Sequence, residues 1–202
     1  MRDVVKIGEA DIVIGPLDRG LHGAACARMM SESEPWISLG RTFERSLAVV
    51  EDVSQEAYAA LNPAGEPVGL LLLMMQGALV GYVRSIVVHP AWRSQRLGEA
   101  LMQFAERRIR QVSPNVFLMV SSSNQRAQRF YQRLGYSEIG TLHQYMISER
   151  DEVLMWKSAR GRLASGSVPI SPHRQRTPSP HENPVECVRP RYAAAALCVS
   201  HR

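Results

Sequence analysis

The sequence predicts an α/β domain built on a mixed β-sheet, and three observations lead to this prediction. Short apolar runs separated by turn residues occupy the middle of the chain, as expected of an antiparallel meander. A long apolar stripe at helical spacing follows them. A continuous apolar run, a second helix and a final pair of strands come next. This alternation of strands and helices after a meander is typical of a mixed sheet.

The first half of the chain predicts two helices followed by three strands. Leu21, Ala25 and Met29 lie at helical spacing and predict the first helix. A second set, made up of Phe43, Leu47 and Val50, predicts the next helix. The apolar runs that predict the strands are residues 57–61, 68–75 and 79–88.

The second half of the chain predicts a helix, a central strand, a further helix and a closing strand pair. The apolar stripe from Leu97 to Val112 is strongly amphipathic. Residues 116–120 are continuously apolar, which predicts a strand buried on both faces. After the second helix, residues 136–147 and 152–156 predict the final strands.

The charge is distributed unevenly along the chain. Residues 1–156 carry 16 basic and 17 acidic side chains, whereas residues 157–202 carry 8 basic and 2 acidic ones. Six of the 12 prolines fall in this second part. We therefore expect one folded domain over residues 1–157 and a disordered basic tail over residues 158–202. A basic tail alone is weak support for nucleic-acid binding.

The cysteines and the apolar segments suggest a cytoplasmic protein. Cys26, Cys187 and Cys198 form no CxxC pair and no metal-ligand spacing, so we expect neither a disulfide framework nor a bound metal. The N-terminus lacks the apolar core of a signal peptide. The most apolar stretch, Val68–Val83, is interrupted by glycines and falls short of the ~18–20 apolar residues that cross a bilayer. We expect no membrane association.

The segment from Ser85 to Leu101 carries the clearest functional signal. It predicts a strand, a short polar loop and a helix that begins at the loop. The first turn of a helix has unpaired N–H groups and the positive end of the macrodipole, which together suit a phosphate or pyrophosphate. Gly98 would let a ligand approach the backbone, and Arg93 and Arg96 add positive charge.

Two motifs in this part of the chain resemble those of the GNAT N-acetyltransferase superfamily. Val88-x-Pro90 followed by Arg93 and Gly98 resembles the family's motif A. The segment from Asn124 to Tyr136 matches every defined position of motif B, Asn-x-x-Ala-x-x-[Phe/Leu]-Tyr-x-[Lys/Arg]-x-Gly-[Phe/Tyr]. The resemblance covers residues 10–157 in layout. It implies a GNAT-like mixed sheet, splayed between the strands at residues 83–88 and 116–121, with helices on both faces.

The resemblance also implies acetyl-CoA, or another acyl-CoA, as donor and a primary amine as acceptor. Backbone groups of the strand would bind the pantetheine arm, and the loop and helix start would hold the pyrophosphate. Asn124 would contact the pantetheine arm, and Tyr131 would protonate the departing thiolate. The residues carried over as cofactor-binding are Ile86, Val87, Val88, Arg93, Ser94, Gln95, Arg96, Leu97, Gly98, Glu99 and Asn124.

The chain departs from the family pattern at two positions. Arg96 replaces the first glycine of motif A, so a backbone contact becomes more crowded while a charge is gained. Some members carry a glutamate base in the strand before motif B, and the matching residue here is Met119, which cannot take a proton. The general base is therefore unassigned.

Several candidates have a purely structural alternative. Tyr131 could be a half-buried core residue, and Asn124 could act only as a helix N-cap. Arg126, Arg129 and Arg133 share one helix face, which suits either solvent or a CoA 3′-phosphate. For Glu34 and Trp36, the alternatives are acceptor binding and packing at a helix junction.

We expect an N-acetyltransferase that works by direct transfer in a ternary complex, with a small-molecule or peptide amine as acceptor. The alternative is a non-catalytic acyl-CoA-binding or regulatory module, which the methionine at position 119 suggests. The identity of the amine and the oligomeric state, including a homodimer, stay open.

Overall fold

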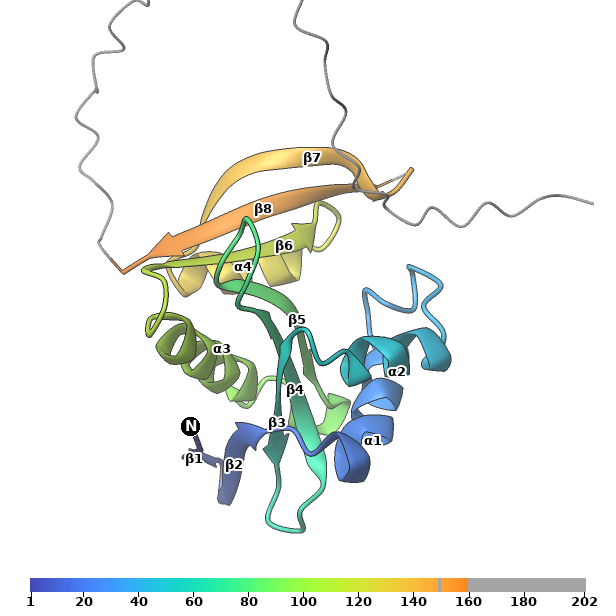
Figure 1. The fold of residues 1–202 in the computed structure, drawn as a ribbon, viewed down its shortest axis with the longest axis vertical. Helices are drawn as coiled ribbons and strands as arrows, with labels where there is room; N and C mark the ends of the chain where they lie inside the picture. Colours follow the sequence, from blue (N-terminus) through green and yellow to red (C-terminus); the bar gives the residue numbers. More distant parts are fainter. Residues whose placement is uncertain (149, 160–202) are drawn as a thin grey trace, which may run out of the picture. The chain divides into compact units, whose positions relative to one another are not determined.

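The structure, a computed structural model, describes residues 1–148 and 150–159. In this part of the chain eight strands form a sheet in the order β1-β2-β3-β4-β5-β6-β8-β7, accompanied by four α-helices and a short 3-10 helix (Figure 1). The strands are β1 (Asp3–Ile7), β2 (Ala10–Pro16), β3 (Glu56–Leu61), β4 (Pro67–Met74), β5 (Tyr82–Val88), β6 (Asn115–Ser121), β7 (Ser137–Ile147) and β8 (Arg150–Ser158). The helices are α1 (Arg19–Ser31), α2 (Phe43–Glu51), η1 (Pro90–Trp92), α3 (Leu97–Ile109) and α4 (Gln125–Arg133). The predicted mixed α/β fold is confirmed.

The sheet is antiparallel except at one junction. Strands β1 to β5 form a meander, and β6, β8 and β7 pair antiparallel to one another. β5 and β6 pair in parallel because α3 returns the chain to the same end of the sheet. The predicted meander is confirmed, but its third strand begins at Tyr82 instead of residue 79. Gly77 and Gly81 both have positive φ, which keeps the preceding segment out of extended conformation.

The N-terminal hairpin of β1 and β2 is absent from the sequence prediction. Its two strands join through a two-residue turn in which Gly8 adopts a φ of +61°. Ile12 and Ile14 on β2 are fully buried in the core. A short strand is hard to recognise in isolation, because its stability depends on the neighbour with which it pairs.

Helices cover both faces of the sheet, as the resemblance implies. Alternate residues of β4 divide between the two faces. Leu71 and Leu73 belong to the core that contains Phe104 of α3. Leu70 and Leu72 belong to a second core, built with residues of α1 and α2. In Figure 1, α1 and α2 lie on the opposite side of β4 and β5 from α3.

Helix α1 buries a different face from the one that the spacing predicts. Met29 is buried as predicted, but Leu21 is 72% exposed and Ala25 is also exposed, whereas Cys26, Ala27 and Met30 are fully buried. The helix packs against α2 as well as the sheet, and Gly23 faces Val50 of α2. Two packing partners therefore decide its orientation, and the apolar spacing of one face alone does not.

Two further predictions in the second half of the chain are wrong in detail. α3 ends at Ile109, and Val112, predicted as the last residue of its apolar stripe, is 57% exposed. β6 is not buried on both faces, because Phe117 and Met119 are only half-buried. Helix α1 lies on the face of the sheet that carries Phe117 and Met119, but it packs mainly against β4 and β5 rather than against β6.

The boundary predicted after residue 157 lies near the end of the last strand. β8 continues through Ser158, one residue beyond the predicted domain. From residue 160 onward the predicted basic tail lies outside the described residues. Within residues 1–148 and 150–159, no helix combines the length and apolar character that a membrane span requires.

Candidate functional site

β5 and β6 separate shortly after they begin, and this leaves one edge of β5 open. Tyr82 pairs with Phe117 and Val83 with Leu118, and the ladder between the two strands ends there. β4 stays paired with β5 as far as Val88. The splay that the resemblance implies is therefore present.

The open edge of β5 offers the backbone groups of alternate residues. The N–H of His89 donates to a carbonyl of the β4 side at 2.9 Å, so the Val88 amide points to the opposite edge. The carbonyl of Val88 accepts from Nε of Arg93 at 3.0 Å. Ile86 has the same orientation as Val88, whereas the Val87 amide faces β4. Of the three predicted strand residues, Ile86 and Val88 can present backbone groups to a ligand.

A groove of about 810 Å³ extends from this open edge between the start of α3 and helix α4. It brings together most of the residues that the sequence singled out. Gln95 and Leu97 are the predicted cofactor residues that do not line it. The lining includes Glu34, Trp36, Ile86, Val87, Val88, Arg93, Ser94, Arg96, Gly98, Glu99, Asn124 and Tyr131. A second groove of about 680 Å³, beside β7 and β8, contains none of the predicted residues.

The N-terminus of α3 opens into the groove without a side-chain cap. Ser94 and Arg96 have φ angles of 62° and 69°, values that L-residues seldom adopt. Arg96 is the N-cap residue, and its side chain makes no capping hydrogen bond. Arg96 thus adopts the backbone conformation that a glycine would take at low cost at this position of the motif. The first N–H groups of α3 are left available to an anion.

Two residues predicted to bind cofactor hold the loop together. Nη2 of Arg93 donates to Oγ of Ser33 at 3.0 Å, which ties the segment after α1 to the loop before α3. Nε2 of Gln95 donates to the carbonyl of Ala91 at 2.8 Å. These contacts give Arg93 and Gln95 a structural role in the loop.

The three arginines of α4 face the groove. Arg126, Arg129 and Arg133 all line it, and Nη2 of Arg126 donates to Oγ of Ser94 at 3.4 Å. Together with Arg93 and Arg96 they surround the α3 N-terminus with positive charge. The three side chains are exposed and line the groove, so both alternatives for this helix face stay open.

Tyr131 lies at the inner wall of the groove and is 8% exposed. Its ring packs edge-on against Phe130 and Tyr136, with centroid distances of 5.2 and 5.9 Å. Burial, and then the neighbouring Tyr82, raise the pKa of Tyr131 above its ordinary value. The hydroxyl is therefore protonated across the physiological pH range.

Asn124 begins α4 and Glu34 stabilises the segment between α1 and α2. Oδ1 of Asn124 accepts from the N–H of Ala127 at 3.1 Å, which confirms the predicted N-cap. Oε2 of Glu34 accepts from Oγ of Ser38 at 2.7 Å. Cys26 is fully buried, and burial raises the pKa of its thiol to about 12, which agrees with the absence of a nucleophilic role for it.

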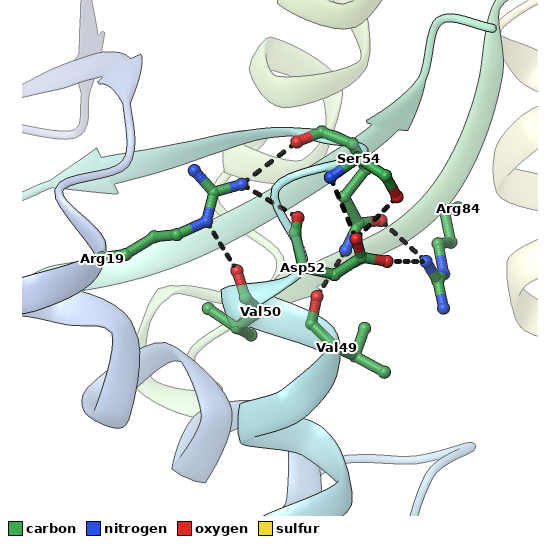
Figure 2. Close-up of polar contacts among 7 residues, drawn as sticks. Arg19, Val49, Val50, Asp52, Ser54 and Arg84 are labelled. Carbon is green, nitrogen blue, oxygen red and sulfur yellow. Dashed lines mark hydrogen bonds and ion pairs between the residues drawn. The ribbon is translucent and has the colours of Figure 1, made fainter.

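A β-bulge in β5 lies beside the splay. The register between β4 and β5 shifts so that Arg84 has no partner of its own. Its Nη1 donates to Oδ2 of Asp52 at 3.2 Å and to Oε1 of Gln55 at 3.1 Å (Figure 2). The guanidinium of Arg19 donates to three carbonyls of the same segment, including that of Val50 at 2.9 Å. This network fixes the bulge to the ends of α1 and α2.

Sequence reasoning missed two residues near the splay, Tyr82 at its narrow end and Glu152 opposite Ser121, where β5 and β6 have separated. Tyr82 lies on the last paired positions between β5 and β6, and Glu152 is a carboxylate on β8 that is only 7% exposed. Burial, ahead of all other influences, raises the pKa of Glu152. In the sequence Glu152 ends the charged run Arg150-Asp151-Glu152 and precedes an apolar one, so no local signal marked it as buried.

The comparisons with known proteins agree with this geometry. A family profile described as "Acetyltransferase (GNAT) family" matches residues 24–136. An aminoalkylphosphonate N-acetyltransferase of Salmonella typhimurium is 35% identical over 80 residues, which cover 37% of this chain and 52% of the relative. The chain thus spans about half the length of that curated relative.

Two solved structures illustrate the similarity of fold. An aminoglycoside 6′-N-acetyltransferase complexed with coenzyme A has a TM-score of 0.61 at 17% identity, covering 72% of this chain and 96% of that one. A spermidine/spermine N-acetyltransferase of Vibrio cholerae has a TM-score of 0.56 at 16% identity, covering 73% and 92%. At identities below 20%, these two structures show a shared fold only.

Proposed function

The chain belongs to the GNAT acetyltransferase family, and from this we propose that it transfers an acetyl group from acetyl-CoA to a primary amine within a ternary complex. One observation carries the proposal. The open edge of β5 and the uncapped N-terminus of α3 line the same groove. An extended amide-containing arm and a pyrophosphate are the two parts of CoA that such neighbouring surfaces suit.

The donor is held by backbone groups and arginines. Ile86 and Val88 bind the pantetheine amides as an added strand would. The N–H groups at the start of α3 receive the pyrophosphate, with Arg96 beside them. Arg126 and Arg129 lie where they can meet the 3′-phosphate, and Asn124 contacts the pantetheine arm.

Gly98 supports this fit. A Cβ added at Gly98 would lie 3.6 Å from Phe130 and 3.8 Å from Val88, which are ordinary contact distances. The surrounding protein therefore does not require glycine at this position. Phe130 and Val88 both line the groove, so the space that the missing side chain leaves belongs to the groove itself.

We expect Gly98→Ala to stabilise the fold and to weaken donor binding. Alanine in place of a helical glycine raises the free energy of unfolding by up to about 1 kcal/mol. The added methyl group narrows the groove, and we expect acetyl-CoA affinity to fall by about tenfold, or ~1.4 kcal/mol. Thermal unfolding and calorimetric titration measure the two effects.

Gly20→Ala is the matched control for this prediction. Gly20 is also the second residue of its helix, and an added Cβ there would meet only the Asp18 side chain, at 3.5 Å. We expect a similar gain in stability with unchanged affinity for acetyl-CoA. Equal affinity of the two variants would contradict the placement of the donor.

The reaction requires oxyanion stabilisation and proton transfer. As the amine nitrogen bonds to the thioester carbon, negative charge grows on the carbonyl oxygen, and the N–H groups of the open edge of β5 stabilise it. The carbon–sulfur bond then breaks and its electron pair stays on sulfur. Tyr131 donates a hydrogen bond, and then its proton, to this sulfur.

Positive charge gathers on the face of the sheet that α2 covers. Arg41, which precedes α2, has its pKa lowered by burial and then by the nearby charges of Arg84 and Arg45. Because Arg84 is ion-paired with Asp52 at 3.2 Å, Arg41 and Arg45 are the charges that would attract an anionic group. We propose that the acceptor carries such a group beside its amine, as the aminoalkylphosphonate of the Salmonella relative does.

A panel of amines tests the activity. We expect 2-aminoethylphosphonate to be acetylated with a higher kcat/KM than spermidine or an aminoglycoside, measured by thiol release and by the mass of the product. Raising the salt concentration should reduce this preference, since the attraction is electrostatic. A preference for spermidine would contradict the anionic acceptor.

Binding of acetyl-CoA, seen as a raised melting temperature, without turnover of any amine would instead favour the non-catalytic alternative.

A further inference from the structure

Glu152 is a buried carboxylate that has no role in the proposed binding of the donor. It lies on β8, opposite Ser121 of β6 and Leu142 of β7. The exposed fraction of Glu152 is 7%. It also lies outside the lining of the groove that holds the proposed donor. Ionised carboxylates are seldom buried in this way without a partner or a function.

The strand register places Glu152 on the face of the sheet opposite α3. Phe117 of β6 pairs with Tyr82 on one side and with Trp156 on the other, so these three side chains share a face. Every second residue keeps that face, and this continues from Trp156 to Glu152 along β8. The adjacent positions Val83, Leu118 and Met155 face the core beneath α3.

The splay leaves a thioester open to the face of the sheet on which Glu152 lies, and Ser121, which pairs with Glu152, is on the part of β6 that has separated from β5. The donor approaches along the groove beside α3 and α4, so a thioester held in the splay is open to an amine from the opposite face. That face is the one on which Tyr82 and Glu152 lie. It is also the face that α1 and α2 cover farther along the sheet.

Glu152 and Tyr131 are both electrostatically coupled to Tyr82. After burial, the charges of Tyr145 and Glu152 raise the pKa of Tyr82 to about 12. Tyr82 in turn raises the pKa of Tyr131. Tyr82 on β5, whose side chain shares the face of Glu152, is thus coupled both to that carboxylate and to the hydroxyl that lines the donor groove.

We propose that Glu152 is the general base, which takes the proton from the acceptor nitrogen as that nitrogen attacks the thioester. The inference rests on the proposed acetyl transfer. The amine enters neutral, having lost its first proton to solvent. The carbon–nitrogen bond forms, the carbon–sulfur bond breaks, and sulfur receives the proton of Tyr131. Glu152 then releases its proton to solvent, and Tyr131 takes one up again.

The surroundings of Glu152 suit it to this role. A base works best when its pKa lies near the working pH, and burial moves the pKa of Glu152 in that direction. Arg150 opposes the shift but does not outweigh burial. Met119, at the position where some relatives carry a glutamate, lies on the same face of β6 two residues before Ser121. Glu152 can thus supply from β8 what Met119 cannot supply from β6.

Glu152→Gln tests the inference, because it removes the base while keeping the shape of the side chain. With saturating acetyl-CoA and 2-aminoethylphosphonate, we expect kcat to fall by about 10²-fold or more. The affinity for acetyl-CoA should stay within twofold. Glu138→Gln, on exposed β7, is the matched control and should keep the wild-type kcat.

The pH profile separates a base from a structural residue. In the wild type, kcat should rise with pH through the pKa of Glu152 and then level off, and Glu152→Gln should lose this rise. Arg150 on β8 acts on Glu152 directly, and Tyr82 on β5 is coupled to Glu152 as well as to Arg84 and Tyr145. The arginines stay charged, and Tyr82 titrates near 12. His143, ion-paired with Asp151 at 3.0 Å, is checked by His143→Gln, which should keep the rise.

The melting temperature of Glu152→Gln and the activity of a conservative variant show whether a loss of kcat comes from misfolding. Because the folded-state pKa of Glu152 is raised, its ionised form costs stability at pH values above that pKa. Glu152→Gln should therefore melt at the same temperature as the wild type or higher at pH 8. Glu152→Asp should retain the rise of kcat with pH at a reduced plateau.

The outcomes distinguish this inference from the function on which it rests. A wild type that acetylates an amine, with a Glu152→Gln variant that keeps more than a third of kcat and the same pH profile, would overturn the role of Glu152 alone. A wild type that neither binds acetyl-CoA nor acetylates 2-aminoethylphosphonate, spermidine or an aminoglycoside would overturn the proposed function, and the role of Glu152 with it.

Discussion

Tyr131→Phe should lower kcat by roughly 10²–10³-fold, the range shared by a positioned acid and a single preorganised hydrogen-bond donor. The substitution deletes the hydroxyl but keeps the ring that packs against Phe130 and Tyr136. Burial raises the pKa of Tyr131, which widens its distance from the pKa of a thiol near ~8.5. The hydroxyl thus acts first as a donor that stabilises the thiolate, and its full proton transfer follows. Thiol release at saturating acetyl-CoA measures the effect.

Tyr136→Phe is the control for this loss of turnover. The hydroxyl of Tyr136 contacts Oε1 of Glu106 at 3.2 Å, in the core and away from the donor groove. We expect this variant to keep kcat within a few-fold while losing about 1 kcal/mol of stability, since a buried carboxylate gives up one hydrogen bond. If both variants lost kcat equally, the effect would come from packing and the acid role would be wrong.

Gly81→Ala should produce the largest loss of stability of the single substitutions considered for this chain, about 2–5 kcal/mol. A Cβ at Gly81 would lie 2.5 Å from Cγ2 of Ile109 and 2.6 Å from the carbonyl oxygen of Asn115. The φ of +87° adds the cost of a left-handed conformation, about 1–2 kcal/mol, to an overpacking cost of about 1–3 kcal/mol. Denaturant unfolding monitored by circular dichroism measures the free energy of unfolding.

Gly77→Ala separates the two contributions. Gly77 has a similar φ of +91°, but an added Cβ there meets nothing within 4 Å. It should therefore cost only the conformational part, about 1–2 kcal/mol. If both variants lost the same free energy of unfolding, the close contacts at Gly81 would not contribute to the loss, and this prediction would be wrong. Because the carbonyl of Gly81 accepts from the N–H of Phe117 at 3.0 Å, we also expect Gly81→Ala to disturb the short β5–β6 ladder that sets the splay.

The local motifs were predictable from the sequence because their determinants lie within a few residues. Asn124 caps α4 through a hydrogen bond three residues along the chain. Gly135 ends the same helix with a φ of +89°. The strand, loop and helix between Ser85 and Leu101 follow from the same short-range rules, and these two segments contribute most of the groove.

The environment of the arginines was not predictable in this way. The spacing of Arg126, Arg129 and Arg133 describes one helix face, but it does not tell which element lies opposite. The tertiary structure turns that face toward the start of α3, where Arg126 meets Ser94, 32 residues earlier. Likewise, Arg93 bonds to Ser33, 60 residues away in the chain.

The sequence by itself determined the order of the elements after the N-terminal hairpin, the two motifs and hence the proposed donor half of the site. Only the tertiary structure decided the proposed acceptor half, where Tyr82 and Glu152 are 70 residues apart in the chain. The physical reason is register. A slip of one residue would turn Glu152 to the other face of the sheet. Its face depends on the pairing of β8 with β6 and on a β7–β8 hairpin whose register shifts twice, and long-range pairing of this kind leaves no mark in the local sequence.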